Sequence, residues 1–331
     1  MANLPLTLAF APNARVRPLL EGTVRPEGIT LTVTQLDPAE IFWRQLHFAE
    51  FDVSEMSLSS LLIVTARGDS PWVGLPIFTT RQFFHTGILV RADAGIAQPA
   101  DLRGKRVGVP EYQQTAAVWC RGALQHEFGV APTELEWYME RTVQDSHGGA
   151  TGFQPPPGVA LRYIPPDQNI ASLMVAGELD ATVFFVARGT RHNRSVIDLR
   201  RHPRVRPLFP DPVAEGRRYY QKTGLFPMNH TVVVRRAIVE RHPWVALNLY
   251  RAFQAAKERA AAETRALVEP YLRLGLLPAE AQAAFATDPF PYGLRANRHA
   301  LETLTQYSYE QGLTPRRVAL EEVFAPSTLD L

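Results

Sequence analysis

Two stretches of this chain join a short apolar run to hydroxyl and amide residues, and a helical pattern follows at once. The first is residues 52–60, Asp-Val-Ser-Glu-Met-Ser-Leu-Ser-Ser, and the second is residues 104–119, which end in Tyr-Gln-Gln-Thr-Ala-Ala-Val-Trp. A helix that starts directly after a strand presents free backbone N–H groups and the positive end of its dipole. Because such helix starts bind carboxylates and phosphates, the two stretches predict a cleft that holds a small anion from both sides.

Two histidines occupy matching places on two strands that are expected to cross between the halves of the chain. His85 stands at the start of the crossing strand 84–90, and His230 stands on the return strand 226–234. A histidine titrates near neutral pH, so it can deliver a proton or activate a phenol. The structural alternative is a core histidine whose nitrogens are both satisfied by the backbone. The paired placement favours a role in catalysis.

Glu55 follows the strand and precedes the helix of the first stretch. It is either a capping carboxylate, worth about 1 kcal/mol, or a desolvated catalytic acid, and both interpretations stay open. Ser57, Ser59 and Ser60 are expected to cap the helix and to donate to a ligand, with Ser57 the preferred contact. No Gly-x-Ser-x-Gly turn surrounds them, so none is expected to be a nucleophile.

Arginine is the residue best suited to bidentate binding of a carboxylate. Arg81, four residues before His85, is the preferred clamp. Arg15 and Arg17, which follow the first expected strand, are alternatives. Either would serve equally as a solvated surface charge, and for Arg15 we favour that interpretation.

The strand-to-helix turn of the second stretch is expected to offer further donors, from Tyr112, Gln113 and Thr115. Glu111 in this turn either accepts from a ligand hydroxyl or caps the helix. Phe184 and Phe185 either stack on a ligand ring or belong to the core, and buried strand aromatics are more often core.

The sequence shows no spacing typical of a metal site. Its one cysteine, Cys120, lies in an apolar helical run, and neither His-x-His nor His-Glu-x-x-His occurs. His192, His202 and His242 lie among arginines and prolines and are expected at the surface. We therefore predict no cofactor and no tightly bound metal, and an ion bound loosely in the cleft is left open.

Expected strands and helices alternate along the chain, as in an α/β protein with a largely parallel sheet. Besides the two crossing strands, strands are expected at 6–10, 29–34, 51–53, 72–78, 105–109, 134–138, 161–164 and 181–186. Helices are expected at 14–20, 38–47, 58–67, 113–127, 169–176, 242–267, 278–286 and 297–311, with a turn at 270–274. Residues 141–160, rich in Gly and Pro, are expected to form a loop near the mouth of a site.

At 331 residues the chain is long for a single core. The crossing strands predict a bilobed protein, with lobe 1 formed by 1–92 plus 224–331 and lobe 2 by 93–223. The ligand is expected in the cleft between the lobes, at the ends of the strands.

Composition excludes several classes of partner. Hydrophobic residues make up 46% and charged residues 21% of the chain, and the net charge of +2 is too small to indicate a nucleic-acid partner. No stretch approaches the roughly 20 apolar residues of a membrane span, and residues 1–10 read as a first strand, which favours a cytoplasmic protein. A homo-oligomer formed through the helical C-terminal third is left open.

The order of elements resembles the type II periplasmic solute-binding fold, as do Asp-Leu-Arg-Gly-Lys-Arg-Val-Gly-Val at 101–109 and Met-Val-Ala-Gly-Glu-Leu-Asp-Ala at 174–181. Among proteins on this fold, the 4,5-dihydroxyphthalate decarboxylases are the ones that residues 51–60, 107–119, 219–234 and 240–245 resemble. The likeness runs from about residue 5 to 325. Loop 141–160 departs from the family pattern, so no ligand contact is assigned to it.

The resemblance implies conversion of 4,5-dihydroxyphthalate to protocatechuate and carbon dioxide, by protonation of the ring and loss of CO2 without an organic cofactor. The catalytic candidates are His85, His230 and Glu55, and the candidates for substrate contacts are Arg17, Ser57, Arg81, Tyr112, Gln113, Thr115 and Asn229. The main alternative is a binding protein for an aromatic or other organic anion, which would not need two histidines in its cleft. A ligand sensor is a third interpretation, and no DNA-binding helix pair supports it.

Overall fold

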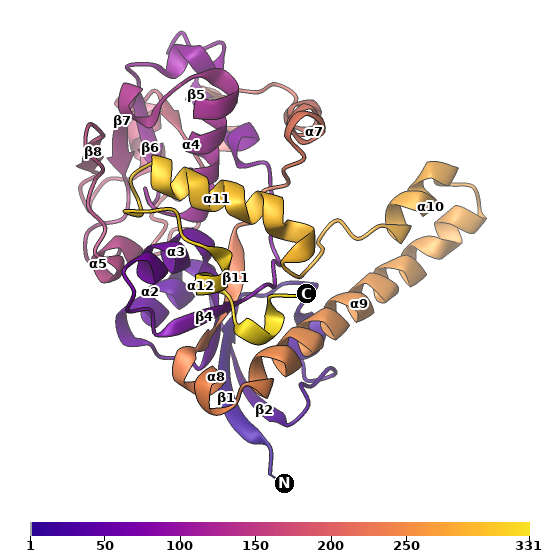
Figure 1. Cartoon of the computed structure of the whole chain (residues 1–331). Helices are drawn as coiled ribbons and strands as arrows, with labels where there is room; N and C mark the ends of the chain where they lie inside the picture. Colours follow the sequence, from indigo (N-terminus) through magenta and orange to yellow (C-terminus); the bar gives the residue numbers. More distant parts are fainter. Residues whose placement is uncertain (1) are drawn as a thin grey trace.

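The computed structural model, which describes residues 2–331, contains two mixed β-sheets with helices packed around them (Figure 1). The first sheet has the strand order β2-β1-β3-β11-β4, formed by β1 (Leu4–Phe10), β2 (Ile29–Gln35), β3 (Val53–Ser57), β4 (Trp72–Leu75) and β11 (His230–Arg235). The second has the order β10-β5-β9-β6-β7-β8, formed by β5 (Leu89–Arg91), β6 (Arg106–Val109), β7 (Glu136–Met139), β8 (Ala160–Tyr163), β9 (Ala181–Thr182) and β10 (Val205–Pro207). We call the parts built on these sheets lobe 1 and lobe 2.

The helices follow the predicted alternation closely. They are α1 (Arg17–Leu20), α2 (Pro38–Phe48), α3 (Leu58–Ala66), α4 (Thr115–Phe128), α5 (His147–Thr151), α6 (Ile170–Ala176), α7 (Pro212–Thr223), α8 (Arg236–Arg241), α9 (Trp244–Arg273), α10 (Ala279–Ala286), α11 (Arg298–Glu310) and α12 (Leu320–Val323). Short 3₁₀ turns occur at η1 (Phe84–Gly87), η2 (Pro99–Leu102), η3 (Pro132–Glu134), η4 (Leu199–Arg201), η5 (Arg295–Asn297) and η6 (Pro326–Thr328).

The structure adds α7, α8 and α12, which none of the expected helices covers, and two further helices differ from the prediction. The helix expected to end at 267 continues through Pro270 to Arg273. Pro270 stands in the last turn, where the loss of one backbone hydrogen bond is tolerated more easily than at mid-helix. The expected loop 141–160 contains α5, a short helix that begins at His147.

The two crossings between the lobes are less regular than the continuous strands expected at 84–90 and 226–234. The first crossing contains the turn η1, and only its last residues pair as β5; the second becomes a strand only at His230. The two segments run antiparallel and meet in a single bridge between Arg81 and Met228. Pro227, next to that bridge, lacks the N–H that a longer ladder would need.

The C-terminal part of the chain fastens the two lobes together. Helix α11 packs against α3 of lobe 1 and α4 of lobe 2, and Figure 1 shows it in front of the lower end of α4 and above α3. In α4, the fully buried Arg121 donates from Nε to Gln311 Oε1 at 2.8 Å, and Gln311 Nε2 donates to the Val118 carbonyl at 2.9 Å. Gly122 lies so close to the ring of Tyr307 on α11 that a Cβ atom would overlap it.

Gly122→Ala is therefore expected to lower the free energy of unfolding by about 1–3 kcal/mol, the usual cost of overpacking. A decrease in the free energy of unfolding would indicate the close contact with Tyr307, because alanine is normally a better helix former than glycine by about 1 kcal/mol. Urea unfolding measures the effect. In a Tyr307→Ala background the same substitution is expected to be neutral or stabilising, and a stabilising effect with Tyr307 present would contradict the close contact of α4 with α11.

Candidate active site

A cavity of about 670 Å3 lies between the lobes. From lobe 1 it is lined by the loop after β1, the start of α2, the end of β3 and the start of β11. From lobe 2 it is lined by the start of α4, by Arg141 and His147, and by residues between 184 and 193. Its lining combines charged and hydrogen-bonding groups with apolar surface from Phe42 and Phe184, as expected of a small-molecule site.

The lobe 1 wall carries a hydrogen-bonded carboxylate and imidazole. In the register of β3 with the antiparallel β11, Ser57 lies opposite His230. Alternate residues of a strand share a face, so Glu55 lies diagonally across from His230 on the same side. His230 Nδ1 is 2.7 Å from Glu55 Oε1, and the other carboxylate oxygen accepts from the Ala11 amide at 3.3 Å. With Nδ1 engaged, Nε2 is the imidazole nitrogen available to a ligand.

The starts of α3 and α4 meet beside this pair. Ser57 and Thr115 are joined through their hydroxyls at 2.8 Å, and Thr115 Oγ1 accepts the Ser59 amide at 3.0 Å. Ser59 Oγ donates to the Gln113 carbonyl at 2.5 Å. The first amides of a helix have no intrahelical acceptor, and Thr115 and Ala116 line the cavity. The start of α4 thus offers neutral donors to an anion there.

The lobe 2 wall is a buried polar cluster around Arg141. Arg141 Nη1 donates to Glu111 Oε2 at 3.2 Å, and Nε donates to the His192 carbonyl at 2.9 Å. Glu111 is fully buried and also accepts from the Ser146 hydroxyl at 2.5 Å and the His147 amide at 3.1 Å. The carboxylate therefore holds the start of α5 and the guanidinium in one place.

His147 projects from this cluster to the cavity. Its Nε2 is 3.2 Å from Arg141 Nη1, and its side chain is almost completely buried. Burial, reinforced by the charge of Arg141, holds the pKa of His147 well below its usual range. The same two causes lower the pKa of His192 to about 4. Both rings are consequently neutral at pH 7.

Two further features shape the cavity. Phe184 lines it with a positive φ of 49°, a conformation that an aromatic residue adopts only at a cost in free energy. Its neighbour Phe185 is buried in the lobe 2 core. Asp37, the N-cap of α2, forms an ion pair with Arg188 across the cavity.

The structure brings together some of the residues predicted from sequence, and five of them line the cavity: Glu55, Ser57, Thr115, Asn229 and His230. Asn229 also ties the site to the crossing, because its amide donates to the Thr80 carbonyl at 3.0 Å and its carbonyl accepts from the Leu58 amide at 3.2 Å.

His85 lies outside the cavity, contrary to the expectation that both histidines face it. The 3₁₀ turn η1 directs its ring into the core, 4.7 Å from the ring of Tyr219 and 5.6 Å from that of Phe209. Its Nε2 is 3.1 Å from Glu215 Oε1 on α7, and burial lowers its pKa. The match with His230 fails because the first crossing is not a strand at this point.

The two predicted arginine clamps also lie elsewhere. Arg81 donates to the carbonyls of Phe226 and Pro291 at 2.9 and 3.2 Å and to the Asn297 side chain, so it fastens the crossing to the C-terminal segment. Burial lowers its pKa to about 10. Arg17 is half-exposed and pairs with Glu263 of α9.

Tyr112 and Gln113 support the cavity from behind. Tyr112 is fully buried, and its ring lies 3.7 Å from the Arg121 guanidinium carbon. Gln113 contributes its carbonyl to Ser59, and its side-chain oxygen accepts from Thr151 at 2.8 Å.

The residues that sequence reasoning missed belong to the 141–160 loop and its surroundings. Arg141 and His147 line the cavity, although no ligand contact was assigned to this loop. His192, expected at the surface, is buried with 3% of its side chain exposed. The local sequence carries no signal for these placements beyond the Glu111 that anchors them. Among residues 2–331 no three His, Cys, Asp or Glu side chains are grouped in a way that could hold a metal ion.

Comparison with known proteins identifies the family. The chain is 35% identical over 339 aligned positions to 4,5-dihydroxyphthalate decarboxylase from Comamonas testosteroni, with 100% of this chain and 99% of the relative covered. It belongs to the 4,5-dihydroxyphthalate decarboxylase family. The relative of the same name from Pseudomonas putida is 35% identical over 221 positions, covering 67% of this chain and 83% of the relative. No family model matches.

Solved structures show that this decarboxylase family member has the periplasmic-binding-protein fold. The aliphatic sulphonate binding protein SsuA from Escherichia coli superimposes with a TM-score of 0.55 at 13% identity, with both chains fully covered. The desulfurization enzyme DszB gives a TM-score of 0.54 at 17% identity, with 99% and 98% covered. The fold serves binding proteins and enzymes alike. Within residues 2–331 the search for a helix long and apolar enough to cross a membrane finds none.

For this decarboxylase family member, stability is expected to fall as the pH is lowered from 7 to 5. His147 and His192 have folded-state pKa values below the unfolded value of about 6.5. In this window the unfolded chain binds more protons than the folded one, so the free energy of unfolding decreases by up to about 1.4 kcal/mol per pH unit for each histidine.

Urea unfolding at pH 7, 6 and 5 measures this slope. His192→Asn is expected to reduce it. A stability that does not depend on pH in this range would contradict the burial of neutral imidazoles.

Proposed function

We propose that this chain converts 4,5-dihydroxyphthalate to protocatechuate and CO2 in the cavity between the lobes, as a cytoplasmic enzyme of aromatic catabolism. The observation that carries the proposal is the Glu55–His230 pair, which faces a cavity lined on the other side by the start of α4 and by His147. The family name of the full-length relative supplies the substrate.

The substrate itself defines what the site must do. Each carboxylate lies para to a ring hydroxyl, so electrons from that oxygen can reach the carbon that carries the carboxylate. The ring carbon gains a proton, the bond to the carboxylate breaks, and its electron pair returns to the ring as CO2 leaves. One proton is consumed, and the hydroxyl keeps its own. The site therefore needs an acid at the ring carbon and donors for the retained carboxylate.

In this proposal His230 is the acid. Glu55 accepts from Nδ1 and fixes the orientation of the ring, so a second proton, on Nε2, can be delivered into the cavity. The Phe42 ring meets the His230 ring edge to face at 4.8 Å and limits its rotation. Ser57 and Thr115 share one hydrogen bond, so one of their two hydroxyls remains free to donate to an oxygen atom of the substrate, together with the first amides of α4.

The decisive test is turnover by chelator-treated protein, followed as released CO2 and as protocatechuate separated by chromatography. His230→Ala is expected to lower kcat by about 100-fold or more, the usual contribution of an acid–base group. Glu55→Gln is expected to lower kcat by less, because the amide keeps a polar partner at Nδ1.

His85→Gln is the matched control, since His85 is a buried histidine outside the cavity, and its kcat is expected to stay close to that of the parent once folding is checked by thermal melting. Tight substrate binding without product would overturn the enzyme proposal in favour of a binding protein. Activity that appears only with added divalent ions would overturn the prediction that no metal is needed.

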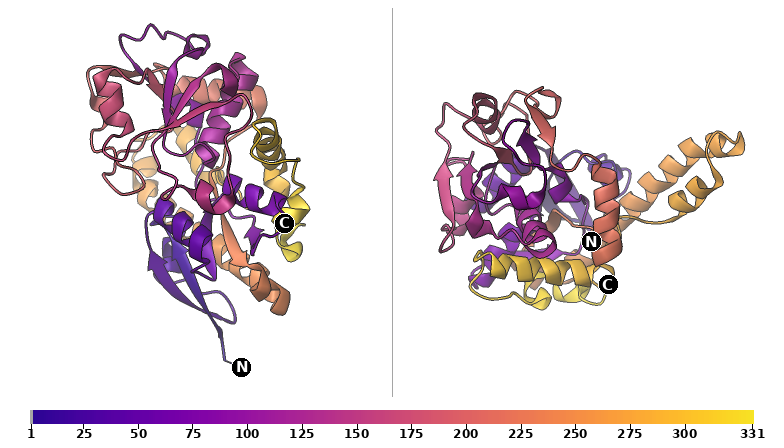
Figure 2. Two further views of the ribbon diagram at one scale, coloured as in Figure 1. Left: turned by 90° about the vertical axis from the view of Figure 1, so that its left-hand side faces the viewer. Right: turned by 90° about the horizontal axis from the view of Figure 1, so that it is seen from above.

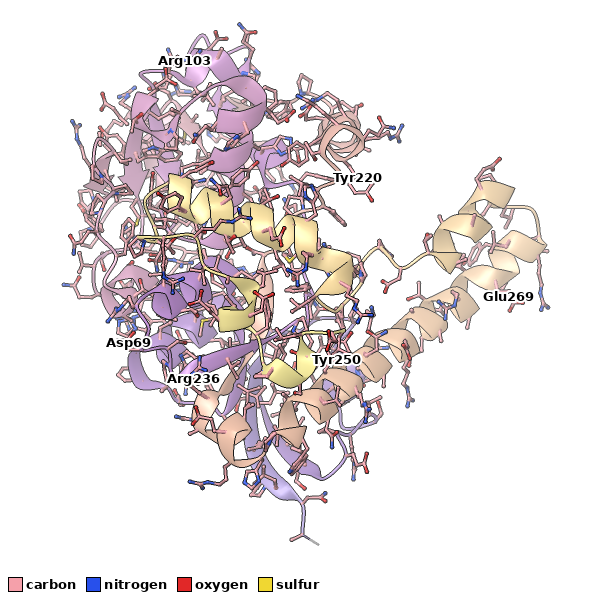
Figure 3. The ribbon with its side chains drawn as sticks, in the orientation of Figure 1. Asp69, Arg103, Tyr220, Arg236, Tyr250 and Glu269 are labelled. Carbon is pink, nitrogen blue, oxygen red and sulfur yellow. The ribbon has the colours of Figure 1, made fainter. Side chains whose placement is uncertain are left out.

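We also propose that the chain self-associates through the hairpin of α9 and α10, which extends away from both lobes in Figure 1 and in the right-hand view of Figure 2. None of residues 258–278 is buried, and Figure 3 places Glu269 near the outer end. Four large apolar side chains are 56–74% exposed there: Leu267, Tyr271, Leu274 and Leu276. A groove of about 790 Å3 lies between α9, the end of α10 and the loop after β1, and includes Leu267, Phe285 and Phe290. The exposed apolar side chains and the groove belong to the same chain. In a symmetric dimer, the exposed side chains of each copy can therefore pack into the groove of the other.

The parent chain is expected to elute with a mass above 37.0 kDa in light scattering, and Leu274→Glu/Leu276→Glu is expected to elute as the monomer. Val196→Glu is the control, because Val196 is equally exposed on lobe 2. A parent chain that is already monomeric at micromolar concentration would contradict the proposal.

A further inference from the structure

We propose that the Nδ1–H group of His147 binds the carboxylate that the substrate keeps, and that Arg141 is the residue that positions it. This inference rests on the proposed function and names the part of the substrate recognised by lobe 2. It makes the site selective for aromatic rings with two adjacent carboxylates.

The hydrogen bond between His147 and Arg141 decides the tautomer of the imidazole. Arg141 Nη1 lies 3.2 Å from His147 Nε2. A guanidinium group has only donors, so Nε2 must be the acceptor and carries no proton. The single proton of the neutral ring is therefore on Nδ1.

Nδ1 is one of two buried polar atoms in the lobe 2 lining of the cavity that lack a partner within residues 2–331; the other is Nε2 of Gln114, at the start of α4. Among the residues that the structure describes, no acceptor meets hydrogen-bonding geometry with it, although the Ala39 backbone is close enough to raise the pKa slightly. The side chain is only 2% exposed, and it lines the cavity. A buried donor without a partner costs free energy, and an oxygen atom of a ligand in the cavity would satisfy it.

The N–H groups of Arg141 already donate to neighbouring residues, so its guanidinium is not free to bind a carboxylate through two hydrogen bonds. Besides His147, it donates to Glu111 and to the His192 carbonyl, and Nη2 lies 3.4 Å from Asn193 Oδ1. Its charge is balanced by the buried carboxylate of Glu111. Arg188, the other cation of the lobe 2 lining, is paired with Asp37. In the described part of the chain, the donors on this wall without a partner are therefore neutral: the imidazole N–H, the side-chain amide of Gln114 and the first amides of α4.

The position of Phe42 explains why the ligand should carry two adjacent carboxylates. The Phe42 ring contacts the His230 ring at 4.8 Å and the His147 ring at 5.5 Å, in both cases edge to face. The two imidazoles thus flank one aromatic ring, His230 on lobe 1 and His147 on lobe 2. A ligand with neighbouring carboxylates can present one to each histidine. The carboxylate at His230 is then the one that is lost, and the one at His147 is retained.

The test is calorimetric titration with phthalate, which has both carboxylates and no hydroxyl groups, so that binding is measured without turnover. His147→Leu is expected to raise the Kd for phthalate by about 10–100-fold, the loss of one hydrogen bond to a charged group. His147→Asn keeps an N–H close to the position of Nδ1 and is expected to restore most of the affinity. His126→Leu, outside the cavity, is expected to leave the Kd unchanged.

The role of Arg141 is tested by a double-mutant cycle with His147, in which the Kd for phthalate is measured for both single variants and for the double variant. Arg141→Leu releases the tautomer and is expected to raise the Kd as His147→Leu does, and the double variant is expected to be no weaker than either single variant. With 4,5-dihydroxyphthalate, His147→Leu is expected to raise KM and to change kcat little, whereas His230→Ala lowers kcat. If Arg141→Leu does not fold, the His147 variants still test whether His147 binds the carboxylate.

The two proposals fail in different ways. An unchanged Kd for phthalate in His147→Leu would overturn the role of His147 even if CO2 is released. Affinity that depends on His147, in a protein that releases no CO2, would support the carboxylate site and overturn the decarboxylase.

Discussion

The meeting of two helix starts is the constraint on which the rest of the site depends. Each start carries a partial positive charge of about half an elementary charge, so placing α3 beside α4 is unfavourable unless oxygen atoms lie between them. Ser57, Ser59 and Thr115 provide those oxygens and join the lobes. An anion in the adjoining cavity relieves the remaining positive potential, which makes the contact between the lobes and the binding of a carboxylate mutually supportive.

The lobe 2 wall solves a different problem, the burial of charge. Taking a charged group out of water typically costs several kcal/mol per ion unless pairing and hydrogen bonds offset it. Glu111 and Arg141 avoid this cost because both are saturated with hydrogen bonds from α5 and the 192–193 backbone region. The result is a wall whose charges are internally balanced and whose outward-facing group is a neutral imidazole. Such a wall can hold a carboxylate without adding a formal charge beside the reacting ring.

The sequence was sufficient wherever function follows local periodicity. The strand-to-helix turns place Ser57 and Thr115 at helix starts, as expected, whereas Glu55, expected after its strand, lies inside β3. Sequence reasoning failed where a contact joins distant segments. His85 and His230 look equivalent as strand residues, but the turn η1 breaks the first strand and directs His85 into the core. Arg141 depends on Glu111, 30 positions away, and no pattern within the 141–160 loop signals that contact.

The fold, too, depends in part on contacts between segments that are far apart in the sequence. The alternation of strands and helices gives both lobes, and the motifs give the family, but the path of the C-terminal segment depends on packing between surfaces far apart in sequence. Helix α11 completes the cores of both lobes. During synthesis on the ribosome, α3 and α4 emerge long before the segment that covers them. The nascent chain must therefore keep two apolar helix faces uncovered until α11 has emerged, so both lobes acquire their final packing only when α11 docks.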